Sequence, residues 1–351
     1  MKNNKQHIIL IKEEVRNALK SLEELPSNAI RILFVTDEKN KMLGTLSDGD
    51  IRRGLLNGFL ISDNISKYIN TKFKYLKKGE EDLEKIKEFK NEGVFLVPVV
   101  DGNNCLVEIL NFEQLITLLP LTALIMAGGR GERLKPLTDS VPKSMLFVGG
   151  KPIIEHTVDR LISFGIKDIY ISVKYLKEQI IDYFGDGSSK GVQINYITEE
   201  EPLGTLGSLS YIESSKYKDI LVINSDILTN IDFEEFFTFF KKKNATMALA
   251  SIPYQVTIPY AVLETIDDKV SSFSEKPTYT YYSNGGIYIF NFALKECIKK
   301  GQFFNATDLM DYIISQKNLS LIHYPVIEYW LDIGKHHDYL KAQEDIKHIK
   351  I

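Results

Sequence analysis

The sequence predicts an α/β protein with a doubly wound, mainly parallel sheet, preceded by a smaller α+β domain. From residue 121 onward, apolar strand-like runs alternate with helix-like segments, an order typical of a sheet covered by helices on both faces. The run 121–127 is nearly all apolar, as a strand buried on both sides requires. The chain has 351 residues, more than the roughly 100–200 of one domain. We therefore expect one domain over 1–118 and a second over 121–351.

Composition and charge limit the classes of function. Hydrophobic residues make up 44% of the chain and charged residues 26%, with a net charge of −4, which is the balance of a soluble globular protein. The chain lacks the basic excess that nucleic-acid binding requires. Cys105 and Cys297 are far apart and suggest free thiols rather than a disulfide framework. The N-terminal apolar run is short and interrupted by charge, so we expect a cytoplasmic protein without a membrane or nucleic-acid partner.

The first 118 residues contain the same order of elements twice. The first pass predicts a helix over 13–22, strands over 30–36 and 42–46, and a helix from Asp48. The second pass predicts a helix over 81–90, strands over 94–100 and 106–110, and a helix over 112–118. In each pass, a polar turn cluster separates the two strands. The pattern indicates an internal duplication.

The segment GTLSDGDIRR at 44–53 and the repeated order resemble a CBS-domain pair, whose halves pack together around adenine or related nucleotides. The resemblance implies that Ser47 and Asp50 contact ribose hydroxyls, and an aspartate can accept two such hydrogen bonds. The alternative is that both residues cap the helix that follows. CBS pairs often associate, so the resemblance also implies a homo-oligomer and a regulatory adenine or guanine nucleotide.

The second half of the repeat departs from that pattern. The sequence Asn-Phe-Glu-Gln at 111–114 stands where the serine or threonine and the aspartate are expected. The resemblance therefore implies at most one ribose site.

The sequence of the second domain predicts alternating helices and strands. Pro152 fits the first turn of a helix to about residue 164, and Gly165 is placed to end it. The remaining elements expected are a strand over 169–173, a helix over 176–184, a strand over 192–197, a helix after Gly204 and a strand over 220–224.

A glycine-rich loop follows the strand 121–127. Gly128, Gly129 and Gly131 stand at its carboxyl end, where open α/β sheets bind their ligands. Their backbone N–H groups can form a nest for phosphate oxygens, and Arg133 adds positive charge. On these residues alone, an ordinary tight turn is the alternative.

The sequence AGGRGERLKPLTDSVPKSML at 127–146 closely resembles the signature of the nucleotide-sugar pyrophosphorylases, or sugar-1-phosphate nucleotidyltransferases. These enzymes couple a sugar 1-phosphate to a nucleoside triphosphate on a Rossmann-like sheet. The resemblance implies that Arg133 and Lys143 hold the triphosphate and that the backbone from Ala127 onward binds the nucleotide.

Further motifs of the same family follow in order. The segment EPLGTLG at 201–207 resembles the loop that binds base and ribose, which implies roles for Glu201, Gly204 and Thr205; a capping turn is the alternative. Asp226 follows an apolar strand, where a Mg²⁺ ligand belongs, although the family usually has glycine rather than serine before it. Asp332 in YWLDIG resembles the second metal ligand.

Two short motifs resemble the sugar-binding part of the family. Glu275 and Lys276 belong to an EKP sequence, and Asn284 and Gly286 belong to an NGGIY sequence. The resemblance implies that the acid contacts sugar hydroxyls, that the lysine contacts the sugar phosphate, and that the second motif lines the sugar site.

The combined resemblance implies a Mg²⁺-dependent transferase acting on a nucleoside triphosphate and a sugar 1-phosphate, without a catalytic histidine. A CBS pair before a short transferase domain resembles the glucosamine-1-phosphate guanylyltransferases of legionaminic acid synthesis, which implies GTP and a glucosamine or related hexose 1-phosphate. The catalytic half also resembles mannose- and heptose-1-phosphate guanylyltransferases. The alternatives are a uridylyl- or thymidylyltransferase on a hexose or heptose 1-phosphate, and a non-catalytic nucleotide-sugar sensor.

Overall fold

The computed structural model describes residues 5–80 and 82–349. The chain divides into two compact units, Met1–Leu118 and Leu119–Ile351, which are described separately. Residue 81, the first of the helix predicted over 81–90, lies outside the described residues. No helix within the described ranges is long and apolar enough to cross a bilayer.

The N-terminal unit contains two three-stranded sheets built to one plan. In each sheet a parallel pair of strands is followed by an antiparallel hairpin. The first half consists of η1 Lys5–His7, β1 Ile8–Leu10, α1 Val15–Glu23, β2 Ile32–Thr36, β3 Met42–Ser47, α2 Asp48–Leu56 and η2 Ile65–Lys67. The second half consists of β4 Leu76–Lys77, α3 Leu83–Asn91, β5 Leu96–Val100 and β6 Leu106–Asn111. The order strand, helix, strand, strand therefore repeats, whereas α2 of the first half has no counterpart in the second.

The two halves of this unit share a hydrophobic core. Phe34 and Met42 from the first half pack in one buried cluster with Leu96 and Val100 from the second. A β-bridge between Lys41 and Cys105 also joins the two hairpins. Each sheet buries one face within its own half, and this shared cluster covers the other face, so the halves stabilise each other.

The helix predicted over 112–118 is wrong, because the segment forms a turn and then an extended run. The Asn111 side chain accepts a hydrogen bond from the Glu113 N–H at 2.9 Å, a local bond that competes with helix formation. The run then places Leu118 in the core. Pro120 follows, and a proline disfavours helical backbone at the residue before it.

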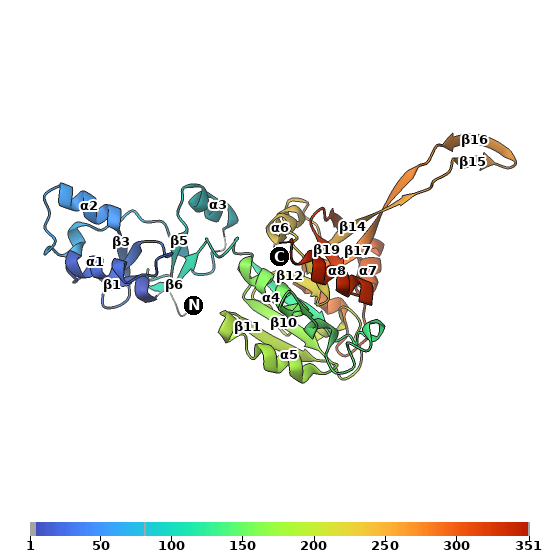
Figure 1. The fold of residues 1–351 in the computed structure, drawn as a ribbon, viewed down its shortest axis with the longest axis horizontal. Helices are drawn as coiled ribbons and strands as arrows, with labels where there is room; N and C mark the ends of the chain where they lie inside the picture. Colours follow the sequence, from blue (N-terminus) through green and yellow to red (C-terminus); the bar gives the residue numbers. More distant parts are fainter. Residues whose placement is uncertain (1–4, 81, 350–351) are drawn as a thin grey trace. The chain divides into compact units, whose positions relative to one another are not determined.

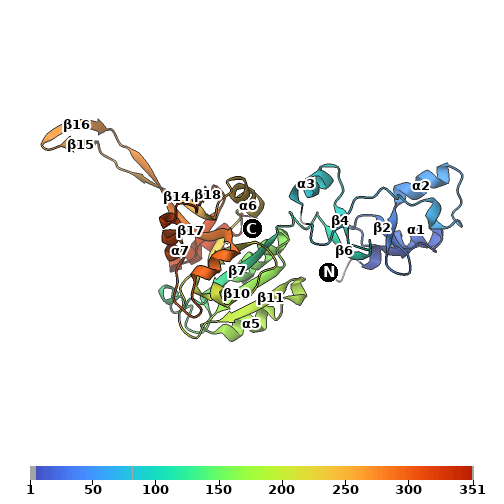
Figure 2. The ribbon, with the colours of Figure 1, turned by 180° about the vertical axis from the view of Figure 1, so that it is seen from behind.

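The C-terminal unit is built on a seven-stranded sheet of order β11-β10-β7-β12-β17-β14-β18 (Figures 1 and 2). The strands are β7 Leu121–Ala127, β10 Asp168–Val173, β11 Gln193–Thr198, β12 Asp219–Asn224, β14 Met247–Thr257, β17 Thr278–Asn291 and β18 Leu321–Pro325. Strand β17 is antiparallel to its neighbours, and the other pairs are parallel. The predicted mainly parallel sheet is thus confirmed. The chain moves from β7 outward to β11 and returns beside β7 as β12, so β7 and β12 border a topological switch point.

Helices and small sheets complete this unit. The α-helices are α4 Ile153–Ser163, α5 Lys177–Phe184, α6 Phe233–Lys242, α7 Ala306–Ser315 and α8 His336–Asp345. The two-stranded sheets pair β8 Phe147–Val148 with β9 Lys151–Pro152, β13 Ile227–Thr229 with β19 Trp330–Asp332, and β15 Val262–Ile266 with β16 Lys269–Ser274. The short 3₁₀ helices are η3 Glu132–Leu134, η4 Lys143–Met145, η5 Ser188–Lys190, η6 Gly207–Tyr211 and η7 Phe292–Cys297.

Local sequence explains where the helices form. Helix α6 buries Phe233, Phe236, Phe237 and Phe240, a spacing that places all four side chains on one face. Its N-cap, Asp232, accepts hydrogen bonds from two backbone N–H groups of the first turn. Helix α4 ends before Gly165, which has a φ of 75°, as predicted, and Pro152, predicted in its first turn, is instead its N-cap. The helix expected after Gly204 forms only as the 3₁₀ helix η6.

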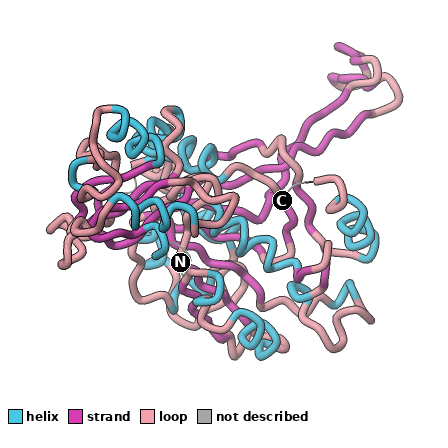
Figure 3. Tube along the Cα trace, turned by 60° about the vertical axis from the view of Figure 1, so that its left-hand side comes forward, coloured by secondary structure: helices cyan, strands magenta, loops and turns pink. Residues whose placement is uncertain are grey.

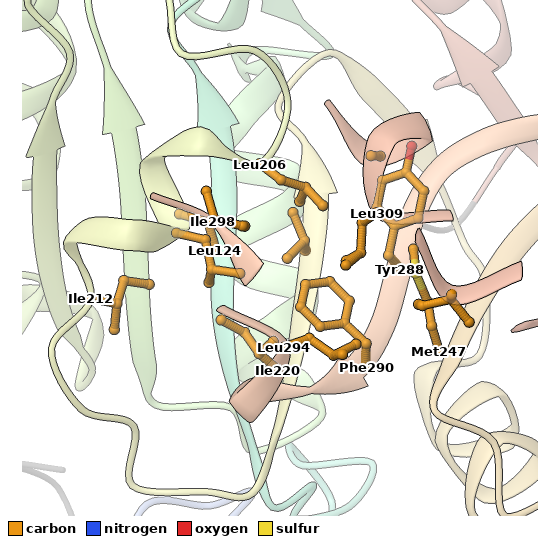
Figure 4. Close-up of a cluster of buried hydrophobic side chains, with 14 of the residues drawn as sticks. Leu124, Leu206, Ile212, Ile220, Met247, Tyr288, Phe290, Leu294, Ile298 and Leu309 are labelled. Atoms are coloured by element: carbon orange, nitrogen blue, oxygen red, sulfur yellow. The ribbon is translucent and has the colours of Figure 1, made fainter. Parts of the chain in front are cut away.

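One hydrophobic core of the unit lies between the sheet and the segments after the carboxyl ends of β11 and β17 (Figure 4). Leu124 and Val222 from adjacent sheet strands share this cluster with Leu206 of the loop after β11 and Leu309 of α7. All four are almost fully buried. The packing fixes the loop around residue 206 beside the switch point.

A long hairpin, residues 252–283 and here called the arm, leaves the sheet. The β14–β17 ladder continues from the sheet to the pair of Thr257 with Thr278, and β15 and β16 form the tip (Figures 1 and 2). Figure 3 shows the paired strands of the arm leaving the body of the unit. No arm residue is buried by any part of the chain that the structure describes.

Candidate active site

A pocket of about 400 Å³ opens at the carboxyl ends of β7 and β12. It therefore lies at the switch point, the usual ligand position in open α/β sheets. Its lining comes from the ends of the strands and the loops that follow them. The lining residues are Met126, Ala127, Gly128, Gly129, Arg130, Lys143, Ser144, Lys174, Glu199, Pro202, Leu203, Gly204, Thr205, Asn224, Ser225, Asp226 and Phe303.

The glycine-rich loop allows charged side chains to approach the backbone. A Cβ atom at Gly128 would lie 3.3 Å from Glu199 Oε1. Gly131 has a φ of 67°, and a Cβ atom there would lie 2.9 Å from Lys143 Cβ. Gly131 is not among the pocket-lining residues. Its contribution is to let Lys143 pack against the loop, since only glycine adopts this conformation without strain.

Three charged side chains meet beside the pocket. The Lys143 ammonium donates a hydrogen bond to Asp226 Oδ2 and lies 3.8 Å from Asp332 Oδ1. The antiparallel pairing of β13 with β19 sets Ile227 opposite Asp332, which brings the two aspartates together from distant parts of the sequence. The Lys143 side chain is only 12% exposed, so its charge acts in a partly dehydrated environment.

The electrostatics of the cluster favour a cation. Burial raises the pKa of Asp332 above its ordinary value, and the nearby Asp226 carboxylate raises it further, whereas Lys143 and Arg133 act in the opposite direction. Arg133 is itself exposed on η3. Because two carboxylates repel each other at short range, additional positive charge there lowers their energy.

The donor set fits Mg²⁺ held together with phosphates. Asp226 and Asp332 both supply carboxylate oxygens, the ligands that Mg²⁺ prefers. Within residues 5–80 and 82–349, no three histidine, cysteine or acidic side chains form a metal-binding group. Mg²⁺ commonly uses one or two carboxylates and completes its coordination with waters and substrate phosphates. The two aspartates are sufficient for that arrangement.

The loop 202–205 is shaped by close backbone packing. Gly204 has a φ of 73°, and a Cβ atom there would lie 2.7 Å from the Phe304 carbonyl oxygen. Thr205 Oγ1 accepts a hydrogen bond from the Ala306 N–H at 2.6 Å, at the start of α7. Both residues line the pocket. The loop therefore serves as a capping turn and as a pocket wall at once.

The acidic residue in the pocket is Glu199 rather than the predicted Glu201. Glu201 does not line the pocket; its side chain is 90% exposed and lies 4.0 Å from the Lys174 ammonium. Glu199 is 7% exposed, accepts a hydrogen bond from Ser172, and accepts another from the Leu203 N–H at 3.2 Å. The sequence signal for Glu199 was its place directly after the strand β11.

Two further pocket residues were not predicted from the sequence. Ser144 lines the pocket and is 2% exposed, and its buried hydroxyl has no hydrogen-bond partner in the described structure. Arg130 lies 5.3 Å from the centre of the Tyr175 ring, a cation–π arrangement that holds its charge at the pocket. Both residues fall within the glycine-rich signature, where a positive charge or a hydroxyl group is a sequence signal for phosphate binding.

The four predicted sugar-site residues are separated in space. Gly286 has a φ of 68°, and a Cβ atom there would lie 2.7 Å from the amide nitrogen of Asn224, a pocket residue. The Asn284 side chain accepts a hydrogen bond from the Gly286 N–H at 2.9 Å. Glu275 and Lys276 instead lie on the arm between β16 and β17, and neither lines the pocket.

In the N-terminal unit, Ser47 and Asp50 form a capping box. Asp50 Oδ2 accepts from the Ser47 N–H at 2.8 Å and from the Ser47 hydroxyl at 2.6 Å, while the Ser47 hydroxyl accepts from the Asp50 N–H at 3.2 Å. Arg53 pairs with the other oxygen of Asp50. The capping alternative is therefore present in the structure, and the ribose contact stays a prediction.

Comparison with known proteins places the second unit in a family. The family described as nucleotidyl transferase matches residues 122–349. The mannose-1-phosphate guanyltransferase of Yarrowia lipolytica is 33% identical over 230 residues, covering 63% of this chain and 63% of that protein. The chain thus spans less than two thirds of that relative.

Two other similar proteins are matched over nearly their whole length. The D-glycero-alpha-D-manno-heptose 1-phosphate guanylyltransferase of Aneurinibacillus thermoaerophilus is 32% identical over 233 residues, covering 65% of this chain and 99% of the relative. The crystal structure of HddC from Yersinia pseudotuberculosis, complexed with GMP-PN, aligns with a TM-score of 0.50 and 26% identity, covering 64% of this chain and 99% of that one.

Proposed function

The chain belongs to the nucleotidyl transferase family, and we propose that it transfers a guanylyl group from GTP to a sugar 1-phosphate, giving a GDP-sugar and pyrophosphate. The observation that carries the proposal is the cluster of Lys143, Asp226 and Asp332 beside a glycine-walled pocket. Guanylyltransferases among the similar proteins support GTP as the donor. We propose glucosamine or a related hexose as the sugar.

The chemistry requires positioning and charge neutralisation rather than a protein nucleophile. An oxygen of the sugar phosphate attacks the α-phosphorus of GTP, and the bond from that phosphorus to the bridging oxygen breaks as pyrophosphate leaves. Both reactants are anions that repel each other. Lys143 and Arg133 supply positive charge at this end of the sheet, and the low exposure of Lys143 strengthens its effect. Fixed orientation of the two reactants supplies much of the remaining rate increase.

Nucleotide binding is assigned to the two glycine-containing loops. The backbone from Ala127 to Gly129 faces the phosphates, and Gly204 and Thr205 form the wall beside the base and ribose. The unpartnered Ser144 hydroxyl offers a hydrogen bond to the nucleotide. Glu201 stands near Lys174 at the rim, where its exposed carboxylate reaches the ribose.

Asp226 and Asp332 are the residues that would hold Mg²⁺. When bound, Mg²⁺ neutralises phosphate charge and polarises the phosphorus that is attacked. Lys143 contacts both aspartates, so it orients the two carboxylates toward the same point.

The N-terminal unit is proposed to be a CBS pair that binds a regulatory adenine or guanine nucleotide at Ser47 and Asp50. The duplicated order of elements supports this assignment, and the fusion supports a link to legionaminic acid synthesis. Calorimetry of the full chain with AMP tests it, because AMP is not a donor substrate. Binding heat that Asp50→Asn abolishes is expected, and absence of heat from the wild-type chain would contradict the assignment.

Pyrophosphate release measured with Mg²⁺ tests the activity. The donors are GTP, UTP, dTTP, CTP and ATP, and the acceptors are the 1-phosphates of glucosamine, N-acetylglucosamine, mannose, glucose and a heptose. The fastest turnover is expected with GTP and a glucosamine or related hexose. Faster turnover with UTP or dTTP would reassign the base, whereas folded protein that is silent with every pair would favour a non-catalytic nucleotide-sugar sensor.

A further inference from the structure

We propose that the arm is exchanged with a second copy of this chain and delivers Glu275 and Lys276 to the sugar side of the other copy's pocket. The proposal rests on the proposed function, since it concerns the same sugar-phosphate site. It makes the functional unit a dimer in which each pocket is completed by the other copy's arm.

The arm exposes several large apolar side chains. Its exposed large side chains include Tyr254, Tyr260, Leu263, Ile266, Phe273 and Tyr281, which are between 56% and 75% exposed. At roughly 150–250 Å² for a large side chain, these six expose on the order of 700 Å². A stable interface buries about 800 Å² on each partner, which is close to this summed exposed area. The arm therefore has the surface that a stable protein interface needs.

The tip of the arm also needs a covering partner. Among the residues that the structure describes, strands β15 and β16 pair only with each other, and residues on both of their faces are exposed. An isolated two-stranded hairpin is marginally stable in water, because neither face buries apolar area. Packing against another protein surface would supply the missing burial.

The arm's own length prevents it from completing the pocket of the same chain. The β14–β17 ladder pairs residues from Ser251 with Asn284 out to Thr257 with Thr278. At about 3.3 Å per residue, this ladder extends roughly 20 Å from the pocket side. Glu275 and Lys276 lie beyond its far end. Folding them back would break the ladder, whereas a second copy receives them with the ladder intact.

The backbone at Lys276 also indicates a functional position. Lys276 has a φ of 45°, a left-handed conformation that is uncommon for a residue other than glycine. Such strain persists where the surrounding structure or a function requires it. The exposed Lys276, directly before Pro277, presents an ammonium group, which suits the phosphate of a sugar 1-phosphate.

Complementation between two inactive full-length variants tests the exchange. Asp226→Asn damages the pocket and leaves the arm intact. Lys276→Ala damages the arm and leaves the pocket intact. The two variants are co-expressed with different tags, and mixed dimers are purified through both tags. In a two-fold exchanged dimer, one of the two sites then has both an intact pocket and an intact arm, so about half of wild-type turnover per dimer is expected.

The matched control combines Asp226→Asn with Lys143→Met. Both residues belong to the pocket of one copy, so every site in the mixed dimer carries a defect and no recovery is expected. Failure to isolate any mixed dimer, or mixed Asp226→Asn and Lys276→Ala dimers no more active than the separate variants, would overturn the exchange.

A photo-crosslink separates this proposal from the proposed function. Benzoylphenylalanine replaces Phe273 at the arm tip in the full chain, and the products are analysed by gel and by mass spectrometry. Crosslinked dimers with adducts on the second unit of another copy are expected, whether or not turnover is found. Adducts confined to the same chain, or no dimeric product, would overturn the exchange even if the wild-type enzyme is fully active.

Discussion

Replacing Gly131 by alanine is expected to slow turnover while the chain stays folded. Gly131 has a φ of 67°, and an added Cβ atom would lie 2.9 Å from Lys143 Cβ and 3.0 Å from Thr138 Cγ2. Carbon atoms in ordinary contact are about 3.5–4.0 Å apart, so Lys143 must move by roughly 0.5–1 Å. A displacement of about 1 Å in a catalytic group can reduce the rate by about 10²-fold. We expect kcat to fall by about 10- to 100-fold.

The stability cost of the same change can be separated with a matched control. Alanine in the left-handed region costs roughly 1–2 kcal/mol. Gly150 has a φ of 89° and no neighbour within 4 Å of its Cβ position, so Gly150→Ala carries that cost without moving Lys143. Both variants are assayed for pyrophosphate release and for urea unfolding. Equal turnover in the two variants, at equal stability, would refute the role assigned to Gly131.

Three other changes have distinct expected signatures. Burial and Asp226 raise the pKa of Asp332, so at a pH between the ordinary aspartate pKa and the folded value the folded chain keeps a proton that the unfolded chain has lost. The free energy of unfolding should therefore fall as the pH rises through that range. Urea unfolding of Asp332→Asn at several pH values should lack this slope. Asp232→Ala removes the cap of α6 and should cost about 1 kcal/mol in urea unfolding without changing kcat. Ser144→Ala removes a buried, unpartnered hydroxyl and should raise the free energy of unfolding by about 1 kcal/mol, while GTP titration calorimetry should show weaker binding.

Local sequence rules predicted the elements that are buried on regular faces. The apolar run of β7 and the segment between Pro152 and Gly165 were predicted within a residue or two, because burial, proline and glycine all agree there. The segment 112–118 failed because a side-chain bond from Asn111 and the approaching Pro120 outweigh its apolar spacing. Helical spacing alone does not reveal such local competition.

The sequence motifs name several of the residues that the structure brings together at the pocket, whereas other positions depend on tertiary structure. Lys143 and Asp226 were predicted from sequence, and the structure places them in contact. Glu199 was not predicted, because the fold rather than the motif decides which of the neighbouring acids is buried in the pocket and which, like Glu201, is exposed. The position of Lys276 on the arm could not be predicted, since the length of the β14–β17 ladder is fixed by pairing across distant residues.

The most direct measurement compares wild-type and Asp226→Asn chains for Mg²⁺-dependent pyrophosphate release from GTP and a hexose 1-phosphate. Asp226 pairs with Lys143 beside the pocket, so the variant should lose at least about 10²-fold in kcat with an unfolding midpoint close to that of the wild type. If the wild-type chain is active and the variant has the same kcat, the assignment of this cluster as the catalytic centre would be contradicted.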